Sequence, residues 1–459
     1  MKQSIYLLLF LFLFIFSACQ SQSAENSKLS AQKKGKQATQ KQQKDTKNAK
    51  WAENAIIYEV NLRHFSEKGT FEGLGKQLGR LKKMGVDVVC LTPIQPIGKK
   101  NRQGKLGNPY AVQDFKNVNS NYGKMESFMT LVKRIHQLNM HIIIDWSATA
   151  ALDSELAQNH KNWFQKDAKK NDVVAFDYEN SELQRYMLDA MKYWVKKTDI
   201  DGFRCINADA ASADFWEKAT HDLSTIKPVF MVASNEKSDF KASTFDASYD
   251  HTFYALMQDI AAGKKNAEDF NLFLKQEKKS VETARRVRFT KLPSEKTPKN
   301  AVFKDFSRTI RSFSVLSYVM SDFPMLQNGQ EANLDKYLSL YDKDAIDWNN
   351  YELQAFYAQL AKLKHENKAL ASGNFGGKMQ GISSNKANDI LAFSRTKDGN
   401  KVVAIFNLSN KKISDIEWRI NKGIEGKYTD FFSGKEKIFD SKTKMSLEAW
   451  EYKIFVFGK

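Results

Sequence analysis

Cysteine is scarce in this chain. Three cysteines occur among the 459 residues, at Cys19, Cys90 and Cys205. Cys90 and Cys205 lie in apolar stretches that are typical of buried strands, where a free thiol is the common state. The chain therefore lacks the cysteines for a disulfide framework, and nothing points to a cysteine-based metal cluster.

The start of the chain has no apolar run long enough to cross a bilayer, which takes about 18 residues. Residues 5–16 form a shorter run that is preceded by Lys2 and followed by small residues up to Cys19. A positive charge before a short apolar run, followed by small residues at the cleavage site, is typical of a secretory signal. The pattern predicts that residues 1–19 are a signal peptide.

Residues 16–19 read Phe-Ser-Ala-Cys, which resembles the bacterial lipobox. In that motif the cysteine becomes the lipidated first residue of the mature chain. The resemblance implies lipidation of Cys19 and an exported protein anchored to a bacterial membrane, at the outer membrane or the cell surface. The alternative is a cysteine that stands at the end of an ordinary signal peptide by accident.

Aromatic residues are absent from residues 20–50, although this segment carries much of the net charge of +18. Eight lysines there face only Glu25 and Asp45. A basic arm that binds nucleic acid usually interleaves aromatic residues that stack on bases. The segment is therefore predicted to be a solvated, disordered linker that does not bind nucleic acid, although attraction to an anionic surface stays open.

From Trp51 onward, short apolar runs alternate with helical patterns. Strands are predicted at residues 55–60, 86–91 and 141–145, and helices at 74–84 and 125–138. Such alternation over about 300 residues favours a parallel sheet, and a closed barrel of eight strands fits this length. An open doubly wound sheet is the alternative, but no Gly-x-Gly-x-x-Gly turn follows the first strand. The predicted fold for residues 51–370 is an α/β barrel, (β/α)8.

The pattern changes after Leu370. Short apolar or alternating runs follow one another, separated by Asn, Gly, Asp and Lys turns. This predicts an antiparallel β domain over residues 371–459. Trp418 and Trp450 are candidates for a sugar platform there, although packing is the more common fate of tryptophan.

The stretch 202–206 reads Gly-Phe-Arg-Cys-Ile and follows a helical pattern over residues 183–197. It is similar to the fourth barrel strand of the α-amylase family, glycoside hydrolase family 13, whose pattern is Gly-Phe-Arg-x-Asp. Residues 55–60, the Gly-Asn-Pro-Tyr at 107–110 and residues 325–331 resemble other strand ends and loops of that family. The resemblance implies α-glucan or maltooligosaccharide as ligand, a short insertion after the third strand at about residues 146–178, a C-terminal β-sandwich and no cofactor.

The resemblance also shows what is missing. The position of the family's nucleophilic aspartate holds Ile206, and that of its acid/base glutamate holds Ser234. Retaining hydrolysis needs two carboxyl groups, one to attack the sugar and one to protonate the leaving oxygen. The catalytic positions therefore predict loss of the double-displacement reaction.

Two further motifs depart from the family in the same way. Residues 145–150 read Asp-Trp-Ser-Ala-Thr-Ala, which retain the aspartate but lack the family's asparagine and histidine. In residues 289–295, Pro293 and Ser294 stand where the family has histidine and aspartate. The family's calcium site commonly uses the missing asparagine, so no metal is expected.

Three family positions are retained, at Tyr110, Asp145 and Arg204. They are predicted either to contact sugar or to serve the structure, since Asp145 and Arg204 are able to form a buried ion pair.

Three functions follow from these alternatives. The first is a catalytically silent lipoprotein that binds a glycan or a protein partner, and it is the prediction adopted. The second is an active α-glucan hydrolase or transferase with displaced carboxylates, drawn from Glu236, Glu295 and Asp209. The third is a structural subunit that binds no sugar.

Overall fold

The computed structural model describes residues 49–236, 244–277, 285–290, 306–334, 336, 338–419, 425–440 and 442–457. The predicted signal peptide, its Cys19 and almost all of the predicted linker lie outside these residues. Within the described part of the chain, no helix has the length and apolar character to cross a membrane. Residues 51–459 form one compact unit. The division of that unit near residue 370 stays a prediction.

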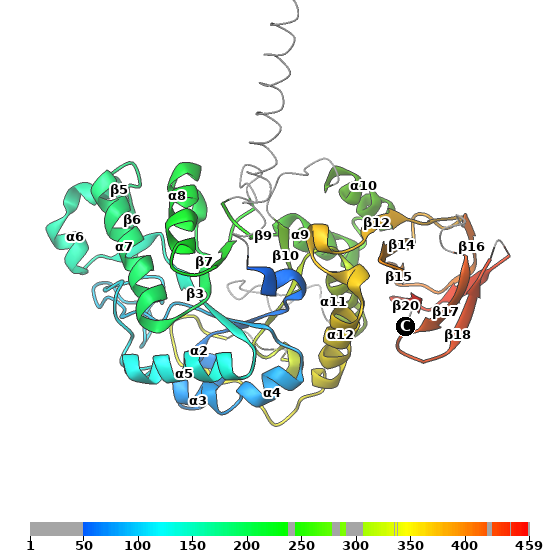
Figure 1. Cartoon of the computed structure of the whole chain (residues 1–459), viewed down its shortest axis with the longest axis horizontal. Helices are drawn as coiled ribbons and strands as arrows, with labels where there is room; N and C mark the ends of the chain where they lie inside the picture. Colours follow the sequence, from blue (N-terminus) through cyan, green and yellow to red (C-terminus); the bar gives the residue numbers. More distant parts are fainter. Residues whose placement is uncertain are drawn as a thin grey trace, which may run out of the picture. The chain divides into compact units, whose positions relative to one another are not determined.

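Eight parallel strands close into a barrel (Figure 1). Around the barrel they run in the order β1, β11, β10, β9, β8, β7, β3, β2, and β1 pairs with both β2 and β11. Closure confirms the predicted (β/α)8 barrel and excludes the open sheet. The strands are β1 Ile57–Val60, β2 Val88–Leu91, β3 His141–Trp146, β7 Gly202–Cys205, β8 Phe230–Ala233, β9 Ala247–Tyr249, β10 Arg285–Phe289 and β11 Phe323–Gln327.

The strands form where the sequence has short apolar runs, because a parallel strand is covered on both faces. All four residues of β2 are buried, as are those of β7 and β8. Gly202 allows β7 and β8 to approach closely: its φ is +149°, and a Cβ there would lie 2.0 Å from the carbonyl oxygen of Phe230. Glycine is required at this position for both reasons.

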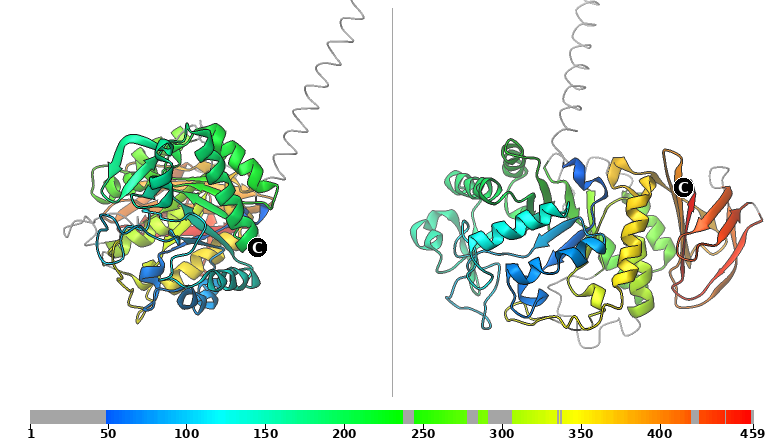
Figure 2. Two further views of the ribbon diagram at one scale, coloured as in Figure 1. Left: turned by 90° about the vertical axis from the view of Figure 1, so that its left-hand side faces the viewer. Right: turned by 60° about the horizontal axis from the view of Figure 1, so that its bottom comes forward.

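Helices surround the barrel strands (Figure 2). They are α2 Leu62–Phe65, α3 Phe71–Gly75, α4 Leu78–Lys83, α5 Met125–Gln137, α7 Ser181–Thr198, α8 Ala213–Ser224, α9 His251–Ala261, α10 Ala267–Glu277, α11 Phe306–Val319 and α12 Gln354–Glu366. Short 3-10 turns join them, at η1 Lys50–Asn54, η3 Ala208–Ala210, η4 Gln330–Ala332, η5 Lys368–Leu370 and η6 Gly373–Phe375.

One helix prediction is wrong. The pattern over residues 74–84 predicts a single helix, whereas the chain forms α3 and α4 with a break at Lys76 and Gln77. Gly73 and Gly75 weaken the helix at this point, because glycine has low helix propensity. The apolar spacing survives the break, since both helices bury leucines.

The segment after β3 forms a small antiparallel sheet. It contains β4 Thr149–Ala151, α6 Glu155–Asn159, η2 Lys161–Trp163, β5 Phe164–Lys170 and β6 Val173–Phe176, and the strand order is β4, β6, β5. The sheet occupies the position of the predicted insertion after the third barrel strand.

Two antiparallel sheets follow the barrel. One contains β12 Lys378–Gly381, β14 Ile390–Lys397, β15 Asn400–Asn407, β17 Gly426–Asp430, β18 Glu436–Phe439 and β20 Tyr452–Phe457, and the other β13 Ser383–Ser384, β16 Ile413–Arg419 and β19 Lys444–Leu447. Buried side chains from both sheets share one apolar core, which includes Trp418. The β domain is thus confirmed, and Trp418 is a packing residue with 8% exposure. The apolar and alternating runs of the sequence predict strands at residues 390–395, 401–408, 415–420, 426–432 and 452–457, and so miss β12, β13, β18 and β19.

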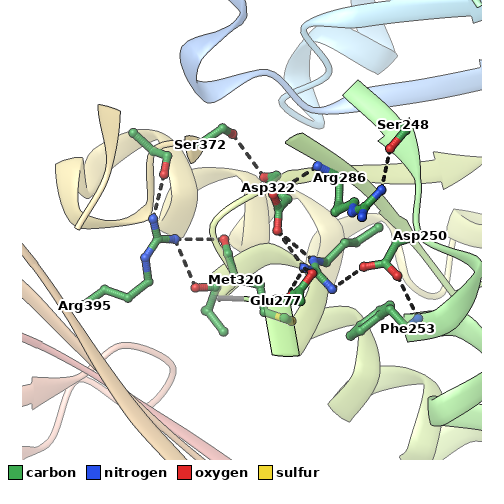
Figure 3. Close-up of polar contacts among 12 residues, drawn as sticks. Ser248, Asp250, Phe253, Glu277, Arg286, Met320, Asp322, Ser372 and Arg395 are labelled. Atoms are coloured by element: carbon green, nitrogen blue, oxygen red, sulfur yellow. Dashed lines mark hydrogen bonds and ion pairs between the residues drawn. The ribbon is translucent and has the colours of Figure 1, made fainter. Parts of the chain in front are cut away.

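Arg395 of β14 connects this domain to the barrel. Its buried guanidinium donates hydrogen bonds to the backbone carbonyls of Val319, Met320 and Ala371 at 2.7–3.2 Å (Figure 3). Its Nε donates to Gly377. Carbonyls at the end of α11 are satisfied in this way by a side chain from another domain.

A second buried arginine, Arg288 of β10, lies among three carboxylates. Its nitrogens are 2.5–2.8 Å from oxygens of Asp250, Glu277 and Asp322 (Figure 3). Burial raises the pKa of Glu277 to about 7, against the opposing effect of Arg288. The cluster joins β10, α9, α10 and the start of β11.

A third charged cluster lies at the amino-terminal ends of the barrel strands. Asp201, just before β7, accepts hydrogen bonds from His136 Nε2 at 2.8 Å and from the backbone nitrogen of Ile142 at 2.8 Å. Lys227 Nζ is 2.9 Å from the other oxygen. The bond to Asp201 raises the pKa of His136, while burial and Lys227 oppose it. Burial acts to raise the pKa of Asp201, but the bonds from His136, His141, Lys227 and the backbone outweigh it and lower that pKa.

These shifts predict pH-dependent stability. The ion pair of His136 contributes fully to the free energy of unfolding below the unfolded-state pKa of about 6.5. This contribution is lost as the pH rises through the higher pKa of the folded state. Asp201 contributes above its unfolded pKa of about 3.9, and its contribution is lost as the pH falls through the lower folded value. We expect Asp201→Asn to lower the free energy of unfolding by about 1–3 kcal/mol at pH 5–6, and by less as the pH rises and His136 loses its charge. Urea unfolding of the wild type and the variant between pH 5 and pH 9 measures this difference in the free energy of unfolding.

The control is Asp222→Asn, which removes a carboxylate that pairs with Lys192 and Lys218 and with no histidine among the described residues. Its effect should stay small and nearly constant between pH 5 and pH 9. A loss in Asp201→Asn that does not change across this range would contradict the role of His136.

Candidate functional site

The candidate site lies at the carboxyl-terminal ends of β7 and β8. These strands pair with Cys205 opposite Ala233, and the backbone nitrogen of Ser234 donates to the carbonyl of Cys205 at 3.0 Å. β7 ends at Cys205, one residue earlier than predicted. Ile206 and Ser234 therefore follow directly on neighbouring strand ends, at the face where active sites of such barrels lie.

Arg204 is the centre of the polar network inside this end of the barrel. Its Nε and Nη2 donate to the two oxygens of Asp145 at 2.5 and 2.8 Å. Its Nη1 donates to Glu59 Oε2 and to the hydroxyl of Tyr249. All three guanidinium nitrogens are thus bound to protein groups, in a bidentate arrangement with Asp145 that only arginine provides.

The network is withdrawn from solvent. Arg204 is 3% exposed, Asp145 0% and Glu59 1%. Burial raises the pKa of Asp145 to about 6, although Arg204 acts to lower it. The neighbouring carboxylates hold the pKa of Arg204 well above its usual range, against the effect of burial. The cluster is therefore a buried arginine with two acidic partners, Asp145 and Glu59, as the structural role considered for Asp145 and Arg204 requires.

Tyr110 lies beside this network and is half-buried. Its hydroxyl donates to Asp145 Oδ2 at 3.2 Å. Its carbonyl accepts from the hydroxyls of Ser147 and Thr149 at 3.2 and 3.0 Å. Thr149 stands where the sequence resemblance places the missing asparagine. At this position its hydroxyl bonds to the backbone of Tyr110 and holds that loop in place. The structure thus brings together all three predicted residues, Tyr110, Asp145 and Arg204.

Ser234 also takes part in loop structure. Its hydroxyl accepts from the backbone nitrogen of Asn207 at 3.2 Å, and the next side chain, Asn235, accepts from the backbone of Ala208 at 3.0 Å. Asn207 has a left-handed φ of 51°, which turns the chain after β7. The loop after β7 is thereby fixed to the end of β8.

The displaced carboxylates have partners in the loops. Asp209 accepts a hydrogen bond from the amide of Asn235, and Glu236 Oε2 accepts from the backbone nitrogen of Thr252 at 2.7 Å. β8 ends at Ala233, so strand alternation does not bring Glu236 onto the face of Ser234. Glu295, Pro293 and Ser294 lie outside the described residues.

The described residues contain no group of three or more His, Cys, Asp or Glu side chains placed to hold a metal ion. The motif after β3 offers Ser147 and Thr149, whose hydroxyls already bond to the carbonyl of Tyr110. Calcium takes six to eight oxygen ligands, usually with several carboxylates. This donor set does not fit the family's calcium ion, and no step is derived through a metal.

Sequence reasoning missed two members of the network, Glu59 and Tyr249. A signal for Glu59 was present, because a lone glutamate within the apolar run of residues 55–60 needs a partner when the strand is buried. No comparable signal marked Tyr249, which reaches Arg204 only because β9 closes the barrel.

The geometry agrees with comparisons to known proteins. Residues 37–173 match the alpha-amylase catalytic domain, and residues 382–452 match the alpha-amylase C-terminal all-beta domain. Over these two stretches the chain is a homologue of the α-amylases. Its curated relatives include the intracellular maltogenic amylase of Bacillus subtilis, 24% identical over 380 residues, and the alpha-amylase MalA of Haloarcula japonica, 22% identical over 398 residues. These matches cover 74% and 79% of this chain but 62% and 56% of the relatives, so this chain spans about three-fifths of their length.

Solved structures of α-amylases are also similar. The maltogenic alpha-amylase AmyB of Thermotoga neapolitana superposes with a TM-score of 0.80 and 27% identity, covering 89% of this chain and 99% of that one. The alpha-amylase of Geobacillus thermoleovorans, solved with acarbose, gives a TM-score of 0.75 at 16% identity, covering 89% and 99%. The second likeness concerns the fold alone.

The Arg204 network predicts a large structural effect. Removing one partner of a buried ion pair leaves the other charge unpaired, at a cost of about 3–5 kcal/mol. We expect Arg204→Met to lower the free energy of unfolding by this amount, as measured by urea denaturation. Arg185→Met, on the exposed face of α7, is the matched control and should change stability by less than about 0.5 kcal/mol. Equal stability of the two variants would contradict the structural role of Arg204.

Proposed function

We propose that this protein is an exported, lipid-anchored member of the α-amylase family that binds α-glucan at the barrel mouth without hydrolysing it. The observation that carries the proposal is that the neighbouring ends of β7 and β8 carry Ile206 and Ser234. The family resemblance places the nucleophile and the acid/base group at these two positions.

The chemistry of these side chains supports the absence of hydrolysis. Ile206 has no atom able to attack an anomeric carbon, and an unperturbed serine hydroxyl does not act as a general acid near neutral pH. The nearby carboxylates are engaged elsewhere: Glu59 and Asp145 pair with Arg204, and Glu236 holds the backbone of Thr252. The barrel mouth thus retains polar and aromatic side chains but lacks carboxyl groups at the nucleophile and acid/base positions.

Binding does not need those reagents. An aromatic ring that stacks on a sugar face and polar groups that bond its hydroxyls are sufficient for a modest affinity. Tyr110 is the proposed sugar contact. Asp145 accepts a hydrogen bond from its hydroxyl and is itself bound by Arg204, so Asp145 and Arg204 serve the proposed binding set by positioning Tyr110. Relatives named as maltogenic amylases, and similar structures solved with acarbose or maltose, favour an α-glucan as the ligand.

One experiment tests binding and turnover together. Calorimetry of the purified full chain with maltoheptaose should show a Kd on the order of micromolar to millimolar. An assay of reducing ends on the same samples should stay at background. Tyr110→Ala should weaken binding, whereas Tyr193→Ala, a half-buried tyrosine on α7, should not.

Two results would contradict the proposal. Release of reducing sugar that Glu236→Gln abolishes would assign catalysis to a displaced carboxylate. No heat at millimolar maltoheptaose would leave a structural subunit that binds no sugar.

The membrane anchor rests on the sequence of residues 1–19. If Cys19 carries the lipid, cells given labelled palmitate should label the wild-type protein and not Cys19→Ala, and the variant should leave the membrane fraction. Cys205→Ala, which removes a buried thiol, is the control and should keep the label. Continued labelling of Cys19→Ala would remove the lipoprotein assignment.

A further inference from the structure

A cavity of about 590 Å³ lies between two barrel helices and the C-terminal sheet, away from the barrel mouth. We call it the interdomain pocket. The barrel contributes Arg311 of α11 and Phe356 and Gln359 of α12, and the β domain contributes Phe432, Tyr452 and Lys453. Its volume falls within the range of about 300–1,000 Å³ that is usual for small-molecule sites.

Aromatic side chains form part of the pocket wall. The rings of Phe432 and Tyr452 meet edge to face with centroids 5.3 Å apart, and both side chains are only partly buried. Phe356 lies opposite, on the barrel side, under the guanidinium of Arg311 at 5.1 Å. The partly exposed rings of Phe432 and Tyr452 provide stacking surfaces for the apolar faces of a ligand, whereas Phe356 is buried.

Two polar side chains of the pocket, Arg311 and Gln359, have hydrogen-bonding groups that a ligand could use. Among the described residues, Arg311 makes no hydrogen bond or ion pair, so its N–H groups remain free to donate. Gln359 is exposed and likewise has no hydrogen-bond partner in the described part of the chain. Burial raises the pKa of Tyr452 and Arg311 acts to lower it, which agrees with a guanidinium close to this phenol.

The charged side chains that line the pocket nearly offset one another. Lys453 lies 4.0 Å from Asp430 and 3.0 Å from Glu451, and both acids line the pocket with Glu352. Asp430 also accepts from the backbone nitrogens of Phe432 and Ser433, which holds this turn in place. Two cations and three carboxylates leave a formal net charge of −1, which does not favour an anionic ligand. A neutral ligand with many hydroxyls fits better.

We propose that the interdomain pocket is a second saccharide site, which takes a neutral oligosaccharide segment. Stacking on Phe432 and Tyr452 would contact the sugar faces, and Arg311 and Gln359 would bond the hydroxyls. The identity of the sugar as an α-glucan rests on the proposed function, whereas the site itself does not depend on the barrel mouth.

The test uses maltotriose as the probe and calorimetry on the purified full chain. Wild type, Tyr110→Ala, Phe432→Ala and the double variant are compared, and thermal melting checks that each variant is folded. In the Tyr110→Ala background, Phe432→Ala should weaken the remaining binding by about five- to tenfold. Arg311→Gln, which changes a partly exposed side chain, should do the same without risk to the core. Phe375→Ala, an exposed phenylalanine that does not line the pocket, is the control.

The outcomes separate the two sites. Loss of all binding in Tyr110→Ala alone would overturn the second site and leave the proposed function intact. Binding unaffected by Tyr110→Ala but lost in Phe432→Ala and Arg311→Gln would support the pocket and overturn the mouth. Binding unchanged by both pocket variants would overturn the pocket, as would displacement of maltotriose by inorganic phosphate. Absence of binding in the wild type would overturn both.

Discussion

The interior of this barrel depends on one buried cation. Arg204 is bound by Asp145 on the neighbouring strand β3, by Glu59 on β1 and by the Tyr249 hydroxyl at the end of β9. A charge at this depth costs several kcal/mol of lost hydration, which only close partners of opposite charge offset. Asp145 stands directly opposite Arg204 on the adjacent strand, whereas Glu59 and Tyr249 reach the guanidinium from strands that do not pair with β7. These contacts fix the relative positions of these strands at the end where a ligand would bind.

The same constraint limits what the mouth is able to do. Asp145 uses both oxygens on Arg204, and one of them also accepts from Tyr110. Ser147, Thr149 and Ser234 use their hydroxyls to hold loop backbone. A polar group that is fully bonded inside the protein has little left to offer a reacting sugar. The polar groups around the mouth therefore hold Tyr110 and the neighbouring loops in place.

Two further buried arginines, Arg288 and Arg395, also bind groups from several elements of the fold. Arg288 collects three carboxylates from α9, α10 and the start of β11, and Arg395 of β14 bonds the carbonyls at the end of α11. In each case a buried guanidinium with several donors satisfies groups from different elements. Residues of α11 and of the β domain also line the interdomain pocket.

The sequence by itself determined the barrel, the β domain and the residues at the ends of β7 and β8. Apolar runs of period two and helical spacing are local signals, and Gly202, Arg204, Ile206 and Ser234 occupy recognisable motif positions. Local signals also misled: the leucine spacing of residues 74–84 does not reveal that Gly73 and Gly75 break the helix. Only the tertiary structure decided that Glu59 and Tyr249 share the guanidinium of Arg204, because residues 59 and 249 meet only when the barrel closes. Closure in space, and not order along the chain, brings such partners together and so decides the role of the retained residues.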